Sequence, residues 1–190
     1  MKNELLHGKL VRLTVENPET VVEHFSKWNR DTEYWRLMAA EPAMPYTKKQ
    51  VKEFVEKELL GDHPDLFFFM IRSLQDDRIL GETGLDGVEW NHGESFVGIS
   101  IGEREFWGKG YGTDAMQVLL RYAFCELNLH RVSLTVFEYN PRAIRSYEKA
   151  GFKIEGRQRK FLERGGKRWD MLYMGILRQE WQAQEQESEK

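Results

Sequence analysis

The chain has 190 residues, of which 41% are hydrophobic and 31% charged, and its net charge at pH 7 is −3. This length suits one domain with a substantial core, and the slightly acidic balance excludes the overall basic field of many nucleic-acid-binding domains. The longest apolar run, at 66–71, is too short to cross a membrane, and residues 1–10 lack the apolar core of a signal peptide. Cys125 is the only cysteine, which suits a reducing compartment, so we expect a cytoplasmic enzyme or binding domain.

In the first third of the chain, one segment, 9–16, alternates apolar and polar residues. After it, apolar residues recur every three or four positions. Asn17 followed by Pro18 is a typical start of a helix, and Thr47 is a second candidate N-cap. The pattern predicts a strand at 9–16 and helices at 18–30, near 31–39 and at 48–60.

From residue 65 onward the apolar pattern has mainly the period of two that is typical of strands, interrupted by two helical segments. Asn140 and Pro141 mark the start of the second of these helices, and Gly151 marks its end. This part predicts strands at 65–73, 78–90, 95–103 and 130–139, helices from the glycine-rich stretch to about 127 and within 140–152, and a final hairpin around 164–167.

The order of these elements predicts an α+β (mixed α/β) domain built on one central sheet. Antiparallel strands come first, and the connection from 95 to 138 runs strand, helix, strand. Those two strands should therefore be parallel, with a right-handed crossover. No repeat or linker-like segment interrupts residues 1–181, so we expect a single domain there, and the polar residues 182–190 predict a frayed tail.

Three glycines at alternate positions, Gly108, Gly110 and Gly112, stand between a predicted strand and a predicted helix. Each costs a regular element about 0.5–1 kcal/mol relative to alanine, so helix stability does not explain them. A glycine-rich turn before a helix leaves free backbone N–H groups at the positive end of the helix dipole, which is a typical anion site. The spacing matches neither the dinucleotide-binding G-x-G-x-x-G nor the P-loop, and a plain turn with a helix cap is the alternative.

A second motif follows at a fixed distance. Asn140 comes directly after a predicted strand, and Tyr147 lies four residues before Gly151, in the pattern N-x6-Y-x3-G-F. Together with the glycine stretch, this pattern resembles the GNAT N-acetyltransferase superfamily, and more narrowly its RimJ/RimL-like branch. The resemblance is strongest over 95–178.

One position departs from the superfamily motif Q/R-x-x-G-x-G/A. Gly110 and Gly112 match its last two positions, whereas Trp107 stands where the motif has Gln or Arg. The narrower branch often has YWGKGY at this point, so the departure is compatible with the resemblance. No physical role for Trp107 follows from the sequence.

The resemblance implies a mostly antiparallel central sheet, flanked by helices, with one parallel strand pair that splays apart with the help of a bulge. The co-substrate acetyl-CoA would lie between the splayed segments 96–102 and 131–138. Its diphosphate would lie on backbone N–H groups of the glycine loop, and its pantetheine arm would extend the first of these strands. The cofactor-binding residues implied by similarity are Ile99, Ser100, Ile101, Trp107, Gly108, Lys109, Gly110, Tyr111, Gly112, Thr113 and Asn140.

The implied reaction is direct attack of a primary amine on the thioester. Tyr147 stands where many family members carry a tyrosine that protonates the leaving thiolate, whose pKa is near 8.5. The alternative for Tyr147 is a half-buried structural tyrosine.

The attacking amine must be neutral. Deprotonation at pH 7 costs about 4–5 kcal/mol for a lysine-like amine but only about 1–1.5 kcal/mol for a protein α-amine. Candidate bases are Glu82, Asp86 and Glu103, and we assign Glu82 because a charge in mid-sheet needs a reason. The alternative is that Glu82 faces outward from its strand.

Two further groups of residues bear on ligands. The five histidines have no metal-ligand spacing, so we expect no metal site; they are His7, His24, His63, His92 and His130. Residues 29–47 are rich in aromatic residues and methionine and, by similarity, would cover the acceptor site. An apolar wall favours an acceptor with an apolar part over a bare polyamine.

We therefore predict an acetyl-CoA-dependent N-acetyltransferase whose acceptor is a protein N-terminus or a small-molecule amine. The alternatives are a polyamine (spermidine-type) acetyltransferase, a non-catalytic acyl-CoA-binding regulatory module on the same fold, and a nucleotide-binding domain that uses the glycine loop differently. We expect no nucleic-acid or membrane partner. The sequence leaves the acceptor and the oligomeric state open, a homodimer included.

Overall fold

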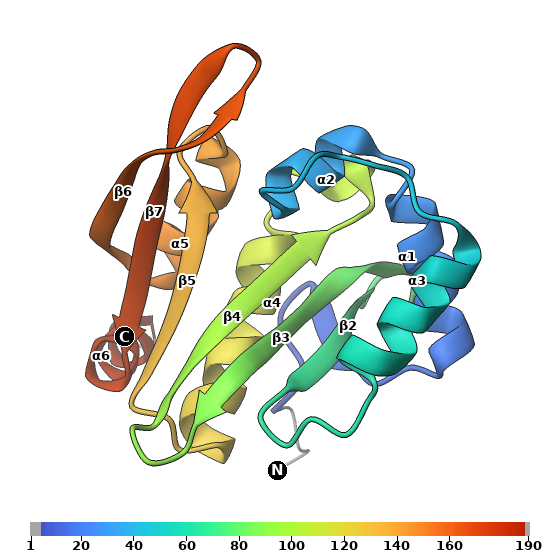
Figure 1. Ribbon diagram of the computed structural model, residues 1–190. Coiled ribbons are helices and arrows are strands. Elements are labelled where there is room, and N and C mark those ends of the chain that lie inside the picture. The colour runs from blue at the N-terminus through green and yellow to red at the C-terminus, as the bar shows by residue number, and fades with distance from the viewer. Residues whose placement is uncertain (1–4, 189–190) are drawn as a thin grey trace.

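The computed structural model describes residues 5–188 and contains one seven-stranded sheet with helices on both faces (Figure 1). The strands are β1 (Val11–Thr14), β2 (Phe67–Ser73), β3 (Ile79–Glu89), β4 (Glu94–Ile101), β5 (Arg131–Phe137), β6 (Lys153–Arg164) and β7 (Lys167–Leu177). The helices are α1 (Pro18–Trp28), α2 (Thr32–Met38), α3 (Lys48–Phe54), α4 (Tyr111–Arg121), α5 (Pro141–Ala150) and α6 (Arg178–Ser188). Shorter helical turns are η1 (Val55–Leu59), η2 (Arg104–Phe106) and η3 (Tyr122–Glu126). The predicted α+β class is confirmed.

Local side-chain contacts start the N-terminal helices where the sequence predicts. The Asn17 side chain accepts a hydrogen bond from the backbone N–H of Thr20 and caps α1. Thr47 and Gln50 form a reciprocal capping box at the start of α3. Because such caps are built from residues three apart, they are readable from sequence alone.

The strand order is β1-β2-β3-β4-β5-β7-β6, and only β4 and β5 are parallel. These two strands pair over just three residues each, 94–96 with 131–133, and then diverge. The expected splayed parallel pair is therefore confirmed. The expected bulge is not in the splayed segment: the irregularity of β4 lies in its pairing with β3, between Asp86 and Glu89.

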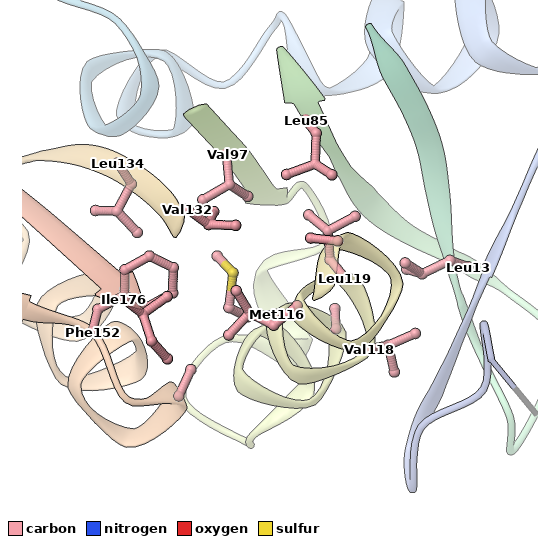
Figure 2. Packing of buried hydrophobic residues seen from close by; sticks show 14 of the residues in the cluster. Leu13, Leu85, Val97, Met116, Val118, Leu119, Val132, Leu134, Phe152 and Ile176 are labelled. Carbon is pink, nitrogen blue, oxygen red and sulfur yellow. The ribbon is translucent and has the colours of Figure 1, made fainter. Parts of the chain in front are cut away.

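Successive side chains along each strand point to opposite faces of the sheet, and the apolar ones form two cores, one on each face. The larger core lies under α4 and α5, where Leu85, Val97 and Leu134 pack against Met116 and Leu119 (Figure 2). The smaller core lies under α1 and α3 and contains Val21, Trp28, Val51 and Met70, among others. The sheet is thus held from both sides except where β4 and β5 separate.

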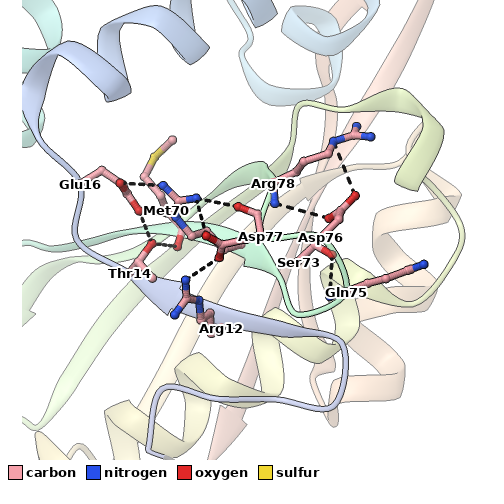
Figure 3. A network of polar contacts seen from close by, with 10 residues as sticks. Arg12, Thr14, Glu16, Met70, Ser73, Gln75, Asp76, Asp77 and Arg78 are labelled. Carbon is pink, nitrogen blue, oxygen red and sulfur yellow. Dashed lines mark hydrogen bonds and ion pairs between the residues drawn. The ribbon is translucent and has the colours of Figure 1, made fainter.

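The free edge of the sheet at β1 is fixed by charged side chains (Figure 3). Arg12 pairs with Asp77 in the turn between β2 and β3 at 2.5 Å, and Arg72 pairs with Glu16 at 2.6 Å. The Arg72 guanidinium lowers the pKa of Glu16. Both pairs tie the short β1 to the long hairpin beside it.

The C-terminal segment differs from the sequence prediction. Residues 182–188 continue helix α6, where a frayed tail was expected; residues 189–190 lie outside the described part. Trp181 packs its ring against Phe124 at 5.4 Å, and Glu180 pairs with Lys153 and caps the N–H of Leu177. These contacts anchor the first turn of α6, so the polar residues after it continue a helix that has already started.

Within residues 5–188, no helix is both long enough and apolar enough to cross a membrane. The cytoplasmic location and the homodimer stay predictions.

The buried Asp114 joins the N-terminal segment to α4. Its carboxylate accepts hydrogen bonds from the backbone N–H groups of Lys9, Leu10 and Val11 at 2.8–3.0 Å. Any side chain at Gly8 would collide with that carboxylate. Asp114 therefore takes the place of a strand partner for the start of β1.

Replacing Asp114 by alanine should lower the free energy of unfolding by about 2–4 kcal/mol, because three backbone N–H groups lose their acceptor. Urea unfolding of the wild type, Asp114→Ala and Asp114→Asn measures this effect. The asparagine variant keeps one acceptor oxygen and should lose less. An alanine variant as stable as the wild type would show that the three bonds are dispensable.

Candidate active site

A cavity of about 540 Å³ lies where β4 and β5 diverge. One part is lined by the start of α4, the loop before it and α5. The other part is lined by α2 and the ends of β4, β5 and β7. The two parts meet at the strand edge that the divergence leaves unpaired, so a ligand lying between the strands would reach both faces of the sheet.

The glycine loop forms one end of the cavity. Gly108 and Gly110 have positive φ angles of 73° and 93°, which other residues rarely adopt. Gly112 does not, but it lies in the first turn of α4 and lines the cavity, where a side chain would occupy ligand space. No side chain caps α4, so its first N–H groups are free to bind an anion.

Most of the predicted cofactor-binding residues line this one cavity. They are Ile99, Ser100, Ile101, Trp107, Gly108, Gly110, Gly112, Thr113 and Asn140. Lys109 and Tyr111 are not among the lining residues; the Tyr111 ring packs edge-on against Phe106 at 4.9 Å. A role for Lys109 and Tyr111 would therefore rest on their backbone.

The unpaired end of β4 is partly satisfied by Trp107. Its indole N–H donates to the carbonyl oxygen of Ile101 at 2.6 Å. Ile99 and Ser100 lie directly before it on the same free edge. This edge can accept an extended chain as a strand would, and the glycine loop beyond it can hold a diphosphate. The residues present therefore fit CoA.

Asn140 and Tyr147 both face this cavity from α5. The Asn140 side chain caps α5 by accepting a hydrogen bond from the N–H of Ala143 at 3.2 Å. Asn140 therefore stabilises the start of the helix, whether or not it also binds CoA. The hydroxyl groups of Thr113 and Ser146 lie 2.8 Å apart and tie α4 to α5. Burial, together with the nearby charge of Glu82, raises the pKa of Tyr147 to about 12.

Glu82 lies opposite Ser100 in the β3–β4 register. Burial raises the pKa of Glu82 to about 7, although the Ser100 hydroxyl acts in the other direction. The hydroxyl of Tyr34, on α2, lies 2.7 Å from the Ser100 oxygen. Burial, and next the charge of Glu82, raises the pKa of Tyr34 as well.

The other two candidate bases are placed differently. Glu103 accepts from Lys27 and from the indole N–H of Trp28. Burial acts to raise the pKa of Glu103, but these bonds outweigh it and the pKa is lowered. Asp86 is exposed and lines the outer part of the cavity. Glu82 is therefore the candidate base whose pKa burial raises to near neutrality.

The outer part of the cavity is mostly apolar. Its lining includes Leu37 and Met38 from α2, and Phe96, Phe137 and Met171 from the strands. The aromatic and methionine segment 29–47 thus contributes to the cavity through α2. In contrast, the rings of Trp35 and Tyr46 pack against each other, with their centroids 5.8 Å apart, so these two side chains contribute to packing within the segment.

Two side chains near the site, Arg164 and Tyr139, make contacts that the sequence does not predict. The Arg164 side chain, at the tip of the β6–β7 hairpin, donates to the carbonyl oxygens of Ala39 and Glu41 at 2.6 and 3.1 Å. Tyr139 donates to the carbonyl of Arg36 at the same end of α2. These bonds bridge the two halves of the sheet across the site. Backbone acceptors have no residue signature, so sequence could not reveal them.

The sequence model of the acetyltransferase (GNAT) domain matches residues 12–153. The chain belongs to the GNAT acetyltransferase family. It is therefore an acyltransferase, and the fold binds acetyl-CoA.

Relatives and solved structures agree with this family. The chain is 31% identical over 162 residues to an uncharacterized N-acetyltransferase, YnaD of Bacillus subtilis, covering 83% of this chain and 91% of the relative. It is 29% identical over 150 residues to the putative ribosomal N-acetyltransferase YdaF of the same species, covering 79% and 80%. The structure resembles a spermidine N-acetyltransferase from Vibrio cholerae in complex with CoA and spermine, with a TM-score of 0.76, 24% identity and 90% and 98% coverage.

Among residues 5–188, no group of three or more His, Cys, Asp and Glu residues is placed to hold a metal ion. The expectation of a metal-free site stays a prediction.

The raised pKa of Glu82 predicts a pH-dependent stability. The folded state holds the proton more tightly than the unfolded state, whose pKa is 4.5, so the unfolding free energy falls as pH rises from about 4.5 through about 7. The full effect of such a shift is about 3 kcal/mol. Glu82→Gln should lack this contribution and gain stability relative to the wild type at pH 8 but not at pH 4.5. Urea unfolding of both proteins at the two pH values measures it, and parallel pH profiles would contradict the assignment.

Proposed function

We propose that this enzyme transfers the acetyl group of acetyl-CoA to a primary amine with an apolar part, with Glu82 as general base and Tyr147 as general acid. The observation that carries the proposal is that the protonated Tyr147 lines the cavity, while Glu82, a carboxyl group of near-neutral pKa, lies on β3 opposite the lining residue Ser100. Catalytic acids and bases need pKa values suited to these opposite tasks.

Acetyl-CoA supplies the activated thioester, and the chain supplies its position. The glycine loop and the first turn of α4 would hold the diphosphate. The free edge at Ile99 and Ser100 would hold the pantetheine arm, with Asn140 beside it. The RimJ/RimL-like resemblance supports these assignments residue by residue, and the shared cavity supports them geometrically.

Glu82 would take the proton of the attacking amine. With a pKa of about 7 it is about half deprotonated at neutral pH, which is near the optimum for a base at that pH. The hydroxyl groups of Ser100 and Tyr34 extend from it and provide a route for the proton. A protein α-amine has a pKa of about 7.7–8, so its proton passes to such a base at little cost.

Tyr147 would present its O–H to the leaving sulfur. With a pKa of about 12 it stays protonated across the physiological range. From the neutral amine, the C–N bond forms and the C–S bond breaks while one proton leaves the nitrogen for Glu82 and one passes from Tyr147 to the sulfur. Glu82 then releases its proton to solvent, and solvent returns one to Tyr147. The charge of Glu82 favours the protonated tyrosine, which links the two groups.

The lining of the cavity favours an apolar acceptor over a polyamine. Among the described residues that line it, Asp86 is the only carboxylate. A polyamine carries several positive charges and is better matched by several carboxylates. A protein N-terminus with an apolar first residue, or a small apolar amine, fits the walls better.

A polyamine acceptor is the second candidate. It is favoured by the likeness to the spermidine enzyme from Vibrio cholerae, whose structure was solved with spermine. The putative ribosomal N-acetyltransferase among the relatives favours a protein N-terminus instead. A non-catalytic acyl-CoA-binding module would bind CoA without turnover.

Replacing Tyr147 by phenylalanine should lower kcat about 100-fold or more, the usual contribution of a general acid, with the dissociation constant of CoA unchanged. CoA release is measured with a panel of hexylamine, phenethylamine, a tripeptide with an apolar first residue, and spermidine. We expect the apolar amines and the peptide to be acetylated faster than spermidine. A phenylalanine variant with wild-type rate and pH profile would remove Tyr147 from the mechanism. The absence of CoA binding by the wild type would refute the proposed function as a whole.

Gly98 should set the size of the acceptor. It lines the cavity on β4 between Phe96 and Ser100, its φ angle is not positive, and an added Cβ would meet nothing within 4 Å. The fold thus has no need for glycine there. Gly98→Val should lower kcat/KM for phenethylamine more than for methylamine, with thermal stability and CoA affinity retained. An equal loss for both amines would show that Gly98 does not face the acceptor.

A further inference from the structure

Arg142 is a cation in surroundings that disfavour a cation. It lies partly buried in the first turn of α5, where the helix dipole is positive, and it lines the cavity. Burial lowers its pKa, and the nearby charge of Arg104 acts in the same direction, opposed by Glu33. Within residues 5–188, no carboxylate lies within ion-pair distance of Arg142, and its guanidinium has no hydrogen-bond partner.

Trp107 holds this guanidinium in place. The guanidinium carbon of Arg142 lies 3.7 Å from the centroid of the indole ring, a close cation–π contact. The indole is itself fixed by its N–H bond to the carbonyl of Ile101. Trp107 therefore connects the end of β4 to the start of α5, across the point where the strands diverge.

Arg104, near the same ring, provides an internal comparison. Its guanidinium carbon lies 5.2 Å from the ring centroid, and it is neutralised by Asp31 at 2.5 Å and Glu33 at 2.7 Å. Of the two arginines around Trp107, Arg104 has two carboxylates at ion-pair distance, whereas Arg142 has none among residues 5–188. The unpaired one lines the cavity, which indicates that its counter-ion arrives with a ligand.

The position of Arg142 indicates which anion this is. Trp107 directly precedes Gly108, and Arg142 lines the same cavity as Gly108, Gly110 and Gly112. We propose that Arg142, held by Trp107, binds the phosphate groups of CoA from the α5 side, opposite the backbone N–H groups of α4. A donor side chain, which the superfamily motif has as Gln or Arg at position 107, would thus come from α5. This inference rests on the proposed function for its cofactor.

The test compares three ligands that share parts of CoA. Equilibrium dissociation constants are measured by calorimetry for CoA, for ADP, which has the adenosine and the diphosphate but no pantetheine arm, and for pantetheine, which has no phosphate. The proteins are the wild type, Arg142→Met, Trp107→Leu, the double variant, and Arg30→Met as a control at an exposed site outside the cavity. Urea unfolding of each variant establishes that it is folded.

Arg142→Met should weaken binding of CoA and ADP about tenfold or more, as expected for loss of a charge-assisted hydrogen bond, and leave pantetheine binding unchanged. Trp107→Leu should weaken the same two ligands. The double variant should be no weaker than Arg142→Met alone, because the indole acts through the guanidinium. Arg30→Met should bind like the wild type, and Arg142→Lys should recover part of the affinity.

Three outcomes would overturn the inference. Unchanged CoA affinity in Arg142→Met would remove the contact, and an equal loss for pantetheine would show a structural effect instead. If Arg142→Met changes only one quantity, the KM of an acceptor that carries a carboxylate, such as the free amino acid phenylalanine, then Arg142 binds the acceptor and not CoA. In each of these cases acetylation of amines by the wild type still supports the proposed function, whose own failure would be the absence of CoA binding or turnover.

Discussion

The divergence of β4 and β5 after three paired residues is the constraint on which the site depends. Backbone groups on a buried strand edge need partners, and here the neighbouring strand has moved away. The indole of Trp107 satisfies one carbonyl, and the rest of the edge is open to a chain with alternating donors and acceptors. The cavity and the exposed start of α4 follow from this gap, and Tyr147 lines the cavity from α5. A fully paired sheet would close it.

The gap persists because the two halves of the sheet are joined on either side of it. The larger core continues under both halves through α4 and α5, which are tied by Thr113 and Ser146. Arg164 and Tyr139 hold the end of α2 from the far half. These contacts offset the free energy lost at the unpaired strand edge. They also fix α2 as a wall of the cavity.

Sequence predicted the parts of this arrangement that have local causes. Capping residues located α1 and α3, and positive φ angles at Gly108 and Gly110 correspond to the glycine pattern. The spacing of Asn140 and Tyr147 placed both on one helix facing one cavity. The helical tail was not predicted because one aromatic contact, that of Trp181, decides it. The Trp107–Arg142 stack joins residues far apart in the chain, and a single sequence gives no sign of such a pair.

The bare strand surface at Gly98 has a consequence for how such enzymes diverge. In the glycine loop, Gly108 and Gly110 are required by their positive φ angles, so their replacement is selected against through folding. At Gly98 nothing in the protein opposes a side chain. A substitution at Gly98 would therefore change the shape of the cavity without displacing any neighbouring atom, so the lining there is free to vary while the fold is kept.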